Sequence, residues 1–211
     1  MYTNAQYQTR DDRPVDDQIV NLHDLSWEDY ERLLTMRGDC SAPRISYLDG
    51  EVEIMSPSQT HEAIKSLLGC LVETYCLERD ITFNTYGSWT LKAQDRSRAA
   101  EPDECWTFGE GPAERPHLAI EVVWTSGGID KLDIYRKLGV AEVWYWRKGR
   151  VQPYCLRGER YVPVTAGEVL PDLNLDLLCG FLDRPSTSEA IRGYRQALAL
   201  RASPSAPGKT P

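Results

Sequence analysis

Two acidic residues in the middle of the chain stand where a carboxylate needs a specific partner. Glu121 interrupts the apolar run 118–124, and Asp103 directly follows Pro102 at the start of another predicted strand. A buried, uncompensated carboxylate costs several kcal/mol, so Glu121 needs a metal cation, a basic side chain or a proton. If the two strands are neighbours, Asp103 and Glu121 face each other and form a hard oxygen site suited to Mg²⁺ or Mn²⁺.

Lys131 is a candidate third member of this site. It lies in the first turn of a predicted helix, and a Ser-Gly-Gly turn at 126–128 can fold that helix back beside the strand. A cation in the first helical turn opposes the helix dipole by a few tenths of a kcal/mol, so the position indicates a partner outside the helix.

Structural explanations for the same residues stay open. Glu121 could form a salt bridge with an arginine at the strand end, and a Pro-Asp step such as that of Asp103 commonly opens a turn. Lys131 could pair on the solvent face with the aspartates of its own helix.

The composition limits the classes to which the chain can belong. Its 211 residues suit one domain, and 41% hydrophobic residues are enough for a core. The polar N-terminus predicts no signal peptide, and no apolar stretch approaches the roughly 18–20 residues of a membrane span, so no membrane association is expected. The net charge of −8 argues against a general grip on nucleic acid but leaves room for a local basic groove. Six cysteines without CxxC or zinc spacing favour a reducing cytoplasm.

The hydrophobic pattern predicts the elements that must position these residues. An Asp-Gly pair at 49–50 predicts a β-hairpin, and apolar residues at three- and four-residue steps predict a helix over 62–78. The strand 118–124 shows no alternation, which predicts that both its faces are covered. A right-handed crossover through a helix over 129–138 would place strands 118–124 and 142–146 parallel. We therefore expect an α/β (α+β) fold. The other predicted elements are helices over 26–36 and 188–200 and strands over 81–83, 88–91, 104–108, 150–156 and 160–164.

We divide the chain into a polar N-terminal segment, 1–20, a folded domain, 21–182, a C-terminal helix, 186–201, and a tail, 202–211. The first segment and the tail lack apolar periodicity, so we expect them to be weakly ordered and dispensable for folding. A chain trimmed to 21–202 should melt within a few degrees of the full chain.

Several short motifs, taken in their order along the chain, resemble one protein family. They are DGEVEIMSPS at 49–58 with His61, EPD at 101–103, AIEVV at 119–123, DK at 130–131, Tyr135 and GVAEVW at 139–144. Each motif is weak alone, but the ordered set resembles the Uma2 family, labelled "putative restriction endonuclease", and most resembles its cyanobacterial members. The resemblance covers about residues 25–180.

This resemblance implies a PD-(D/E)xK nuclease-like core, a mixed β-sheet flanked by helices. In that superfamily the Pro-Asp aspartate and the acidic residue of the second strand bind the metal, which implies Asp103 and Glu121. Val123 stands where the superfamily places its lysine, and Uma2 proteins look as if a lysine on the following helix replaces it, which implies Lys131. Glu62 matches a position where the fold often offers an extra acidic group.

The expected activity is therefore that of a Mg²⁺-dependent endodeoxyribonuclease, with Mn²⁺ as the other candidate metal and nucleic acid, DNA above RNA, as the substrate. Lys131 would orient the attacking water or stabilise the transition state. His61 also matches a family position, either as a catalytic group or as a core residue that hydrogen-bonds the hairpin. A homodimer in the cytoplasm is expected.

The alternative function is a catalytically inactive nuclease fold that serves as a binding or assembly module. Convergence of Asp103, Glu121 and Lys131 would favour the enzyme. A Lys131 that points away, or an arginine against Glu121, would favour the module. Four aromatic residues, Trp124, Trp144, Tyr145 and Trp146, fit a core or a dimer interface better than a platform for stacking bases.

Overall fold

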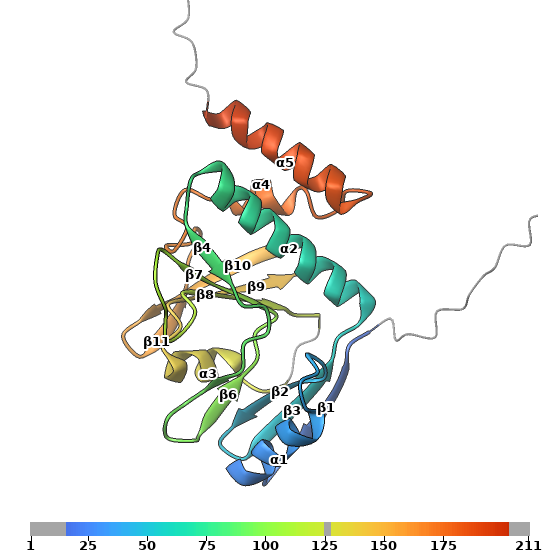
Figure 1. Ribbon diagram of the computed structural model, residues 1–211, viewed down its shortest axis with the longest axis vertical. Helices are drawn as coiled ribbons and strands as arrows, with labels where there is room; N and C mark the ends of the chain where they lie inside the picture. The colour runs from blue at the N-terminus through green and yellow to red at the C-terminus, as the bar shows by residue number, and fades with distance from the viewer. Residues whose placement is uncertain (1–15, 125–127, 203–211) are drawn as a thin grey trace, which may run out of the picture.

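Eleven strands and five helices make up the part of the chain that the structure describes, residues 16–124 and 128–202 of a computed structural model. The strands form two sheets, and helices lie against both of them (Figure 1). This is the mixed α+β organisation that the sequence predicted. Of the predicted turn 126–128, only Gly128 belongs to the described residues.

The first sheet has five strands in the order β1-β3-β2-β6-β5, and all of its pairs are antiparallel. Its strands are β1 (Gln18–Leu22), β2 (Arg44–Leu48), β3 (Glu51–Ser56), β5 (Leu91–Lys92) and β6 (Arg98–Ala100). The predicted hairpin is β2–β3, where Asp49 and Gly50 both take positive φ, the conformation such a tight turn requires. Helix α1 (Trp27–Arg37) covers one face of this sheet, and Ser26 and Asp29 form a capping box at its start.

The second sheet has six strands in the order β11-β10-β9-β8-β7-β4. Its strands are β4 (Phe83–Thr85), β7 (Glu104–Phe108), β8 (Leu118–Val122), β9 (Glu142–Arg147), β10 (Arg150–Arg157) and β11 (Arg160–Pro163). The predicted parallel pair is β8 with β9, and every other pair is antiparallel. Strand β7 is the other neighbour of β8, so the strand that follows Asp103 does lie beside the strand that carries Glu121.

Strand β8 is buried on both faces, as its continuous apolar run predicted. Leu118, Ile120 and Val122 belong to a core shared with α2 (Gln59–Glu78), α4 (Leu175–Cys179) and α5 (Thr187–Ala202). Ala119 belongs to a second core with Ile134 and Tyr135 of α3 (Lys131–Leu138). Side chains alternate across a strand, so Glu121 shares the face of Ala119 and points toward α3.

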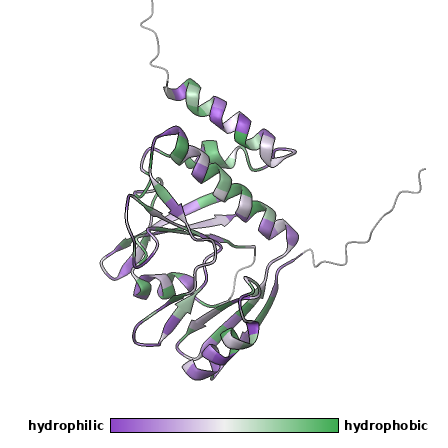
Figure 2. Cartoon of the chain, in the orientation of Figure 1, coloured by the Kyte–Doolittle hydropathy of each residue, from purple (hydrophilic) through white to green (hydrophobic). Residues whose placement is uncertain are grey.

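The C-terminal helix α5 packs beside α2, on the face of the second sheet opposite α3. Its buried residues Ala190, Tyr194 and Leu198 recur every four positions, which places them on one face of α5. Hydrophobic and hydrophilic residues accordingly alternate along α5 in Figure 2. Among the described residues, no helix combines the length and the hydropathy needed to cross a membrane.

The structure differs from the sequence predictions mainly in its short and peripheral elements. Residues 18–20 were expected to be weakly ordered, but they belong to β1, which pairs with β3 from Gln18 to Leu22. Backbone hydrogen bonds hold this strand although most of its side chains are exposed, so no apolar periodicity marks it. Strand β6 and helix α4 were also not predicted. Residues 1–15 and 203–211 lie outside the described residues.

Candidate active site

Glu121 is held by two side chains from α3. Lys131 Nζ donates a hydrogen bond to Glu121 Oε2 at 2.8 Å, and the Tyr135 hydroxyl donates to Oε1. Lys131 and Tyr135 are four residues apart, so they lie on the same face of the helix. Both ends of α3 are capped, which fixes this geometry. The Asp130 side chain accepts a hydrogen bond from the Asp133 N–H at the start of the helix, and Gly139 ends it with a left-handed backbone conformation.

The electrostatics of this group keep Lys131 protonated. Burial raises the pKa of Glu121, and the Lys131 ammonium opposes that shift. Burial would lower the pKa of Lys131, but the charges of Glu121, Asp103 and Glu53 raise it well above its usual range. Lys131 is therefore suited to donate hydrogen bonds and to stabilise negative charge, and it is not suited to act as a general base near neutral pH.

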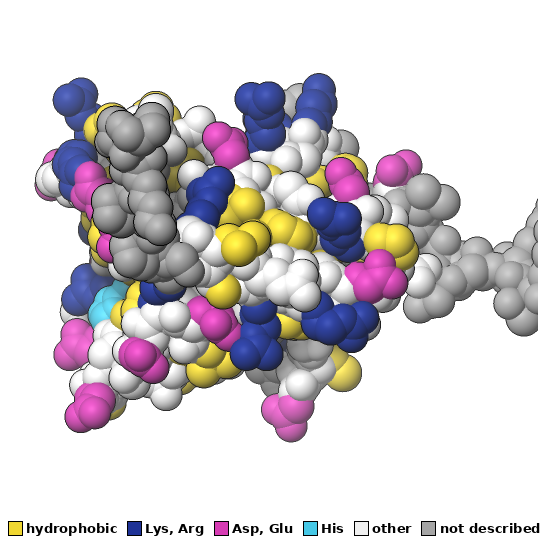
Figure 3. All heavy atoms as spheres, turned by 90° about the horizontal axis from the view of Figure 1, so that it is seen from above, with side chains coloured by type: hydrophobic (Ala, Val, Ile, Leu, Met, Phe, Trp, Pro, Cys, Tyr) yellow, Lys and Arg dark blue, Asp and Glu magenta, His cyan; other side chains and the backbone are white. Residues whose placement is uncertain are grey.

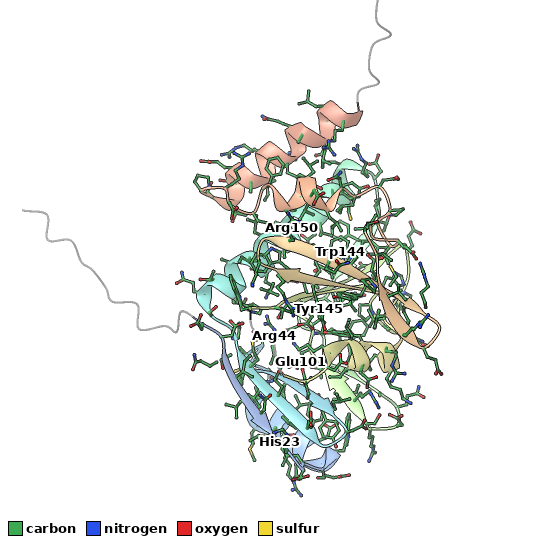
Figure 4. All side chains as sticks on the ribbon, turned by 180° about the vertical axis from the view of Figure 1, so that it is seen from behind. His23, Arg44, Glu101, Trp144, Tyr145 and Arg150 are labelled. Atoms are coloured by element: carbon green, nitrogen blue, oxygen red, sulfur yellow. The ribbon has the colours of Figure 1, made fainter. Side chains whose placement is uncertain are left out.

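Asp103 is completely buried and is held by groups from three elements. Its Oδ2 accepts a 2.6 Å hydrogen bond from the Val122 N–H of β8 and lies 3.0 Å from His61 Nε2. Its Oδ1 lies 2.5 Å from Arg44 Nη1. Burial would raise the pKa of Asp103, but the Arg44 charge and the His61 contact hold it well below its usual range. Arg44, labelled in Figure 4, lies in the middle of the molecule, where the two sheets approach each other.

His61 joins Asp103 to the N-terminal segment. Its Nδ1 lies 2.8 Å from Asp17 Oδ2, and the Asp17 Oδ1 accepts from the Ser58 N–H. Burial would lower the pKa of His61, but its hydrogen bonds to Asp103 and Asp17 raise it to about 9. An imidazolium between two carboxylates fits this geometry, with both ring nitrogens acting as donors. His61 thus contacts a candidate site residue directly, and its Nε2 also lies 3.5 Å from Nη1 of Arg44, the first residue of the β2–β3 hairpin.

Glu62 lies at the edge of this group. It accepts from Arg44 Nη2 at 2.9 Å and from Lys65 Nζ at 3.1 Å, and its side chain is 41% exposed. Arg44 therefore bridges Glu62 and Asp103, and the link of Glu62 to Asp103 runs through this arginine.

A cavity of about 210 Å³ opens beside Glu121 and Lys131. Its polar wall includes the carboxylate of Glu53, which accepts from the Ile129 N–H at 3.3 Å. Its apolar wall includes Trp124, which is 41% exposed and packs edge-on against Trp146. Asp103 does not line this cavity, because β8 and its neighbours enclose it.

The aromatic residues of β9 separate into two kinds of environment. Trp144 and Trp146 are buried in the core, as the sequence interpretation favoured, and Tyr145 faces the cavity beside Glu121.

The donor chemistry of Asp103 and Glu121 fits a hard divalent cation such as Mg²⁺ or Mn²⁺. Asp103 Oδ1 is a buried acceptor to which no described donor is aligned for a hydrogen bond, although the Arg44 guanidinium lies close. Such an oxygen could bind a metal if the Arg44 guanidinium moved away. The described residues hold no group of three or more His, Cys, Asp or Glu side chains arranged around one point. A metal bound by these two carboxylates would therefore complete its shell with water, backbone or substrate oxygens.

The structure brings Glu121 and Lys131 into direct contact and places Asp103 one strand away, while Glu62 stays peripheral. Sequence reasoning missed the roles of Arg44, Asp17 and Tyr135. The spacing of Tyr135, four residues after Lys131, was a usable signal. Arg44 begins a mostly apolar strand, but nothing in the sequence marks its partners.

The sequence profile of one family, Uma2, described as "putative restriction endonuclease", matches residues 27–182. A crystal structure from Anabaena variabilis, described as a putative nuclease belonging to DUF820, is similar over 81% of this chain and 99% of that chain. The TM-score is 0.50 and the sequence identity is 13%, a level that supports a common fold and no more. Among curated proteins no match was found. The match over residues 27–182 spans most of the chain, which therefore belongs to the Uma2 family.

Proposed function

We propose that this chain is a divalent-metal-dependent endonuclease that hydrolyses phosphodiester bonds, with DNA as its substrate. The observation that supports this most strongly is the buried contact of Lys131 with Glu121 on the wall of a cavity, with Asp103 one strand away. Metal-assisted hydrolysis needs acidic residues that bind the metal and a cation that stabilises the transition state. Two acidic residues at adjacent strands and a lysine from the next helix can fill these roles. Membership of a family described as "putative restriction endonuclease" points the same way.

In this proposal Asp103 and Glu121 bind Mg²⁺ or Mn²⁺. When bound, the metal would lower the pKa of a water and neutralise charge on the scissile phosphate. Tyr135 fixes the orientation of Glu121 by its hydrogen bond to Oε1, and the Val122 N–H fixes Asp103 through Oδ2. The protein thus anchors one oxygen of Asp103 by a hydrogen bond and both oxygens of Glu121, the second through Lys131.

Lys131 is the proposed transition-state donor. Its ammonium stays protonated because carboxylates surround it, so it can donate a hydrogen bond to a phosphate oxygen that gains charge. The position of Nζ, 2.8 Å from Glu121 Oε2 on the cavity wall, keeps that donor beside the proposed metal ligand. The lysine absent at Val123 would thus be supplied from α3.

DNA binding by a chain of net charge −8 requires local attraction rather than a broad basic surface. On the face shown in Figure 3, Lys and Arg side chains are interspersed with Asp and Glu. We also propose that the chain is cytoplasmic, which its six cysteines, all free thiols, support. A homodimer is the last part of the proposal.

One observation favours the second candidate, an inactive module. The Arg44 guanidinium lies against Asp103, and a permanent internal cation at that carboxylate would exclude a metal. The arginine contacts Asp103 and not Glu121, and Lys131 points into the candidate site, so the enzyme remains the better supported function.

Nicking of supercoiled plasmid tests the proposal. The wild-type chain should nick with Mg²⁺ or Mn²⁺ and stop when EDTA is added, and Asp103→Asn should lose at least 100-fold in rate. Glu142→Gln is the matched control, because Glu142 is a buried carboxylate on β9 that accepts from the backbone N–H groups of residues 168 and 169. Equal nicking by the wild type and Asp103→Asn would reject the proposal, and absence of nicking in every metal would favour the module.

A further inference from the structure

The Asp103 oxygen that faces Arg44, Oδ1, accepts no aligned hydrogen bond from the described residues. An arginine that stabilises a buried carboxylate usually forms two parallel N–H···O bonds with it. Here one nitrogen, Nη1, approaches one oxygen, Oδ1, and the other terminal nitrogen turns to Glu62 at 2.9 Å. Asp103 Oδ1 and Arg44 Nε are both buried without an aligned hydrogen-bond partner among the described residues. Both residues thus carry an unsatisfied group, which is costly in a buried site.

The same chain contains a buried Arg–Glu pair whose carboxylate is satisfied. Glu101 Oε2 lies 2.5 Å from Arg37 Nη1 and also accepts from the Ile45 N–H at 3.0 Å. The Thr90 hydroxyl donates to Glu101 Oε1 at 2.6 Å, so both carboxylate oxygens are hydrogen-bonded. Arg37 also approaches its carboxylate through one nitrogen, and its Nε is likewise buried without a partner among the described residues. The difference from Arg44–Asp103 is therefore in the carboxylate, and the pair, which ties α1 to the first sheet, serves as the structural reference for Arg44.

We propose that Arg44 is an internal counter-ion that competes with the divalent metal for Asp103 Oδ1 and so sets the metal affinity of the site. On metal binding the guanidinium leaves Asp103 and keeps Glu62 as its anion. The second oxygen of Asp103 stays anchored by the Val122 N–H and His61, so the carboxylate need not move when Arg44 does. This inference rests on the proposed metal site, and it assigns Arg44 and Glu62 functions distinct from metal ligation or chemistry.

Calorimetric titration of the full chain with Mn²⁺ tests the inference without relying on activity. Arg44→Met removes the competing charge, and Arg44→Gln does so while it keeps a polar side chain that can hydrogen-bond. Both should bind Mn²⁺ at least tenfold more tightly than the wild type, a difference of about 1.4 kcal/mol. Saturating Mn²⁺ should also raise their melting temperatures more than that of the wild type. Arg37→Met, at the structural pair, should lower stability and leave Mn²⁺ affinity unchanged.

The outcomes separate this inference from the proposed function. Folded Arg44 variants that bind Mn²⁺ no more tightly than the wild type overturn the inference, and the function stands if the wild type still nicks plasmid. If Arg44→Met does not fold, Arg44→Gln decides. A wild type that neither binds Mn²⁺ nor nicks, beside an Arg44→Gln variant that binds, would uphold the inference and reject the function. Absence of Mn²⁺ binding in every variant overturns the inference.

Discussion

Replacing Lys131 by methionine removes the cation from a buried pair while it keeps most of the side-chain volume. The Glu121 side chain is only 2% exposed and that of Lys131 is 13% exposed, so the substitution leaves a nearly buried carboxylate without its counter-charge. Breaking one side of a buried ion pair costs about 3–5 kcal/mol. The Tyr135 hydroxyl still donates to Glu121, so we expect about 3 kcal/mol of lost stability. Plasmid nicking should fall about 100-fold or more.

The assay is urea unfolding at pH 7 without metal, together with plasmid nicking. Lys137→Met provides the control on the same helix, because Lys137 pairs with Asp95 at the surface, where such pairs contribute about 0–1 kcal/mol. If Lys131→Met unfolds with the same free energy as Lys137→Met and nicks like the wild type, then Lys131 is neither the counter-ion of Glu121 nor a catalytic donor.

Two further predictions concern the N-terminal side of the site. The Asp17 and Asp103 carboxylates raise the pKa of His61 from 6.5 to about 9, and Arg44 is the nearby cation that opposes this shift. Charged His61 therefore stabilises the fold fully below pH 6.5, and this stabilisation is lost as the pH rises through 9. This amounts to roughly 3 kcal/mol, and His61→Asn should show no such loss when urea unfolding is repeated between pH 6 and 10. A chain of residues 16–202 should melt within a few degrees of the full chain. A chain of residues 23–202 should melt several degrees lower, because it lacks β1 and Asp17. Equal melting temperatures for the two shortened chains would show that β1 contributes nothing to stability.

The central strand and the helix after it could be predicted because their signals are local. The apolar run around Glu121 is long enough to indicate a strand covered on both faces, and Gly139 marks the end of the next helix. The right-handed crossover rule then makes β8 and β9 parallel. A charged residue in a buried strand needs a partner, and the first turn of that helix carries Lys131. The local pattern thus led to the contact that the structure contains.

The surroundings of Asp103 could not be predicted because they come from distant parts of the chain. Arg44 is 59 residues before Asp103, and His61 is 42 residues before it, so no spacing rule connects them. Asp17 lies in a polar segment, where an acidic residue is ordinary. Strand β1 escaped prediction for a related reason: its pairing with β3 depends on backbone hydrogen bonds, and these leave no mark on residue type.

The most direct test of the proposed metal site is a Mn²⁺ titration of the wild type, Asp103→Asn, Glu121→Gln and the double variant. We expect that the wild type binds Mn²⁺ and that each single substitution weakens binding at least tenfold, or by about 1.4 kcal/mol. Circular dichroism should show that all four proteins are folded. Equal Mn²⁺ affinity in the wild type and the double variant would contradict the claim that Asp103 and Glu121 form the metal site of this chain.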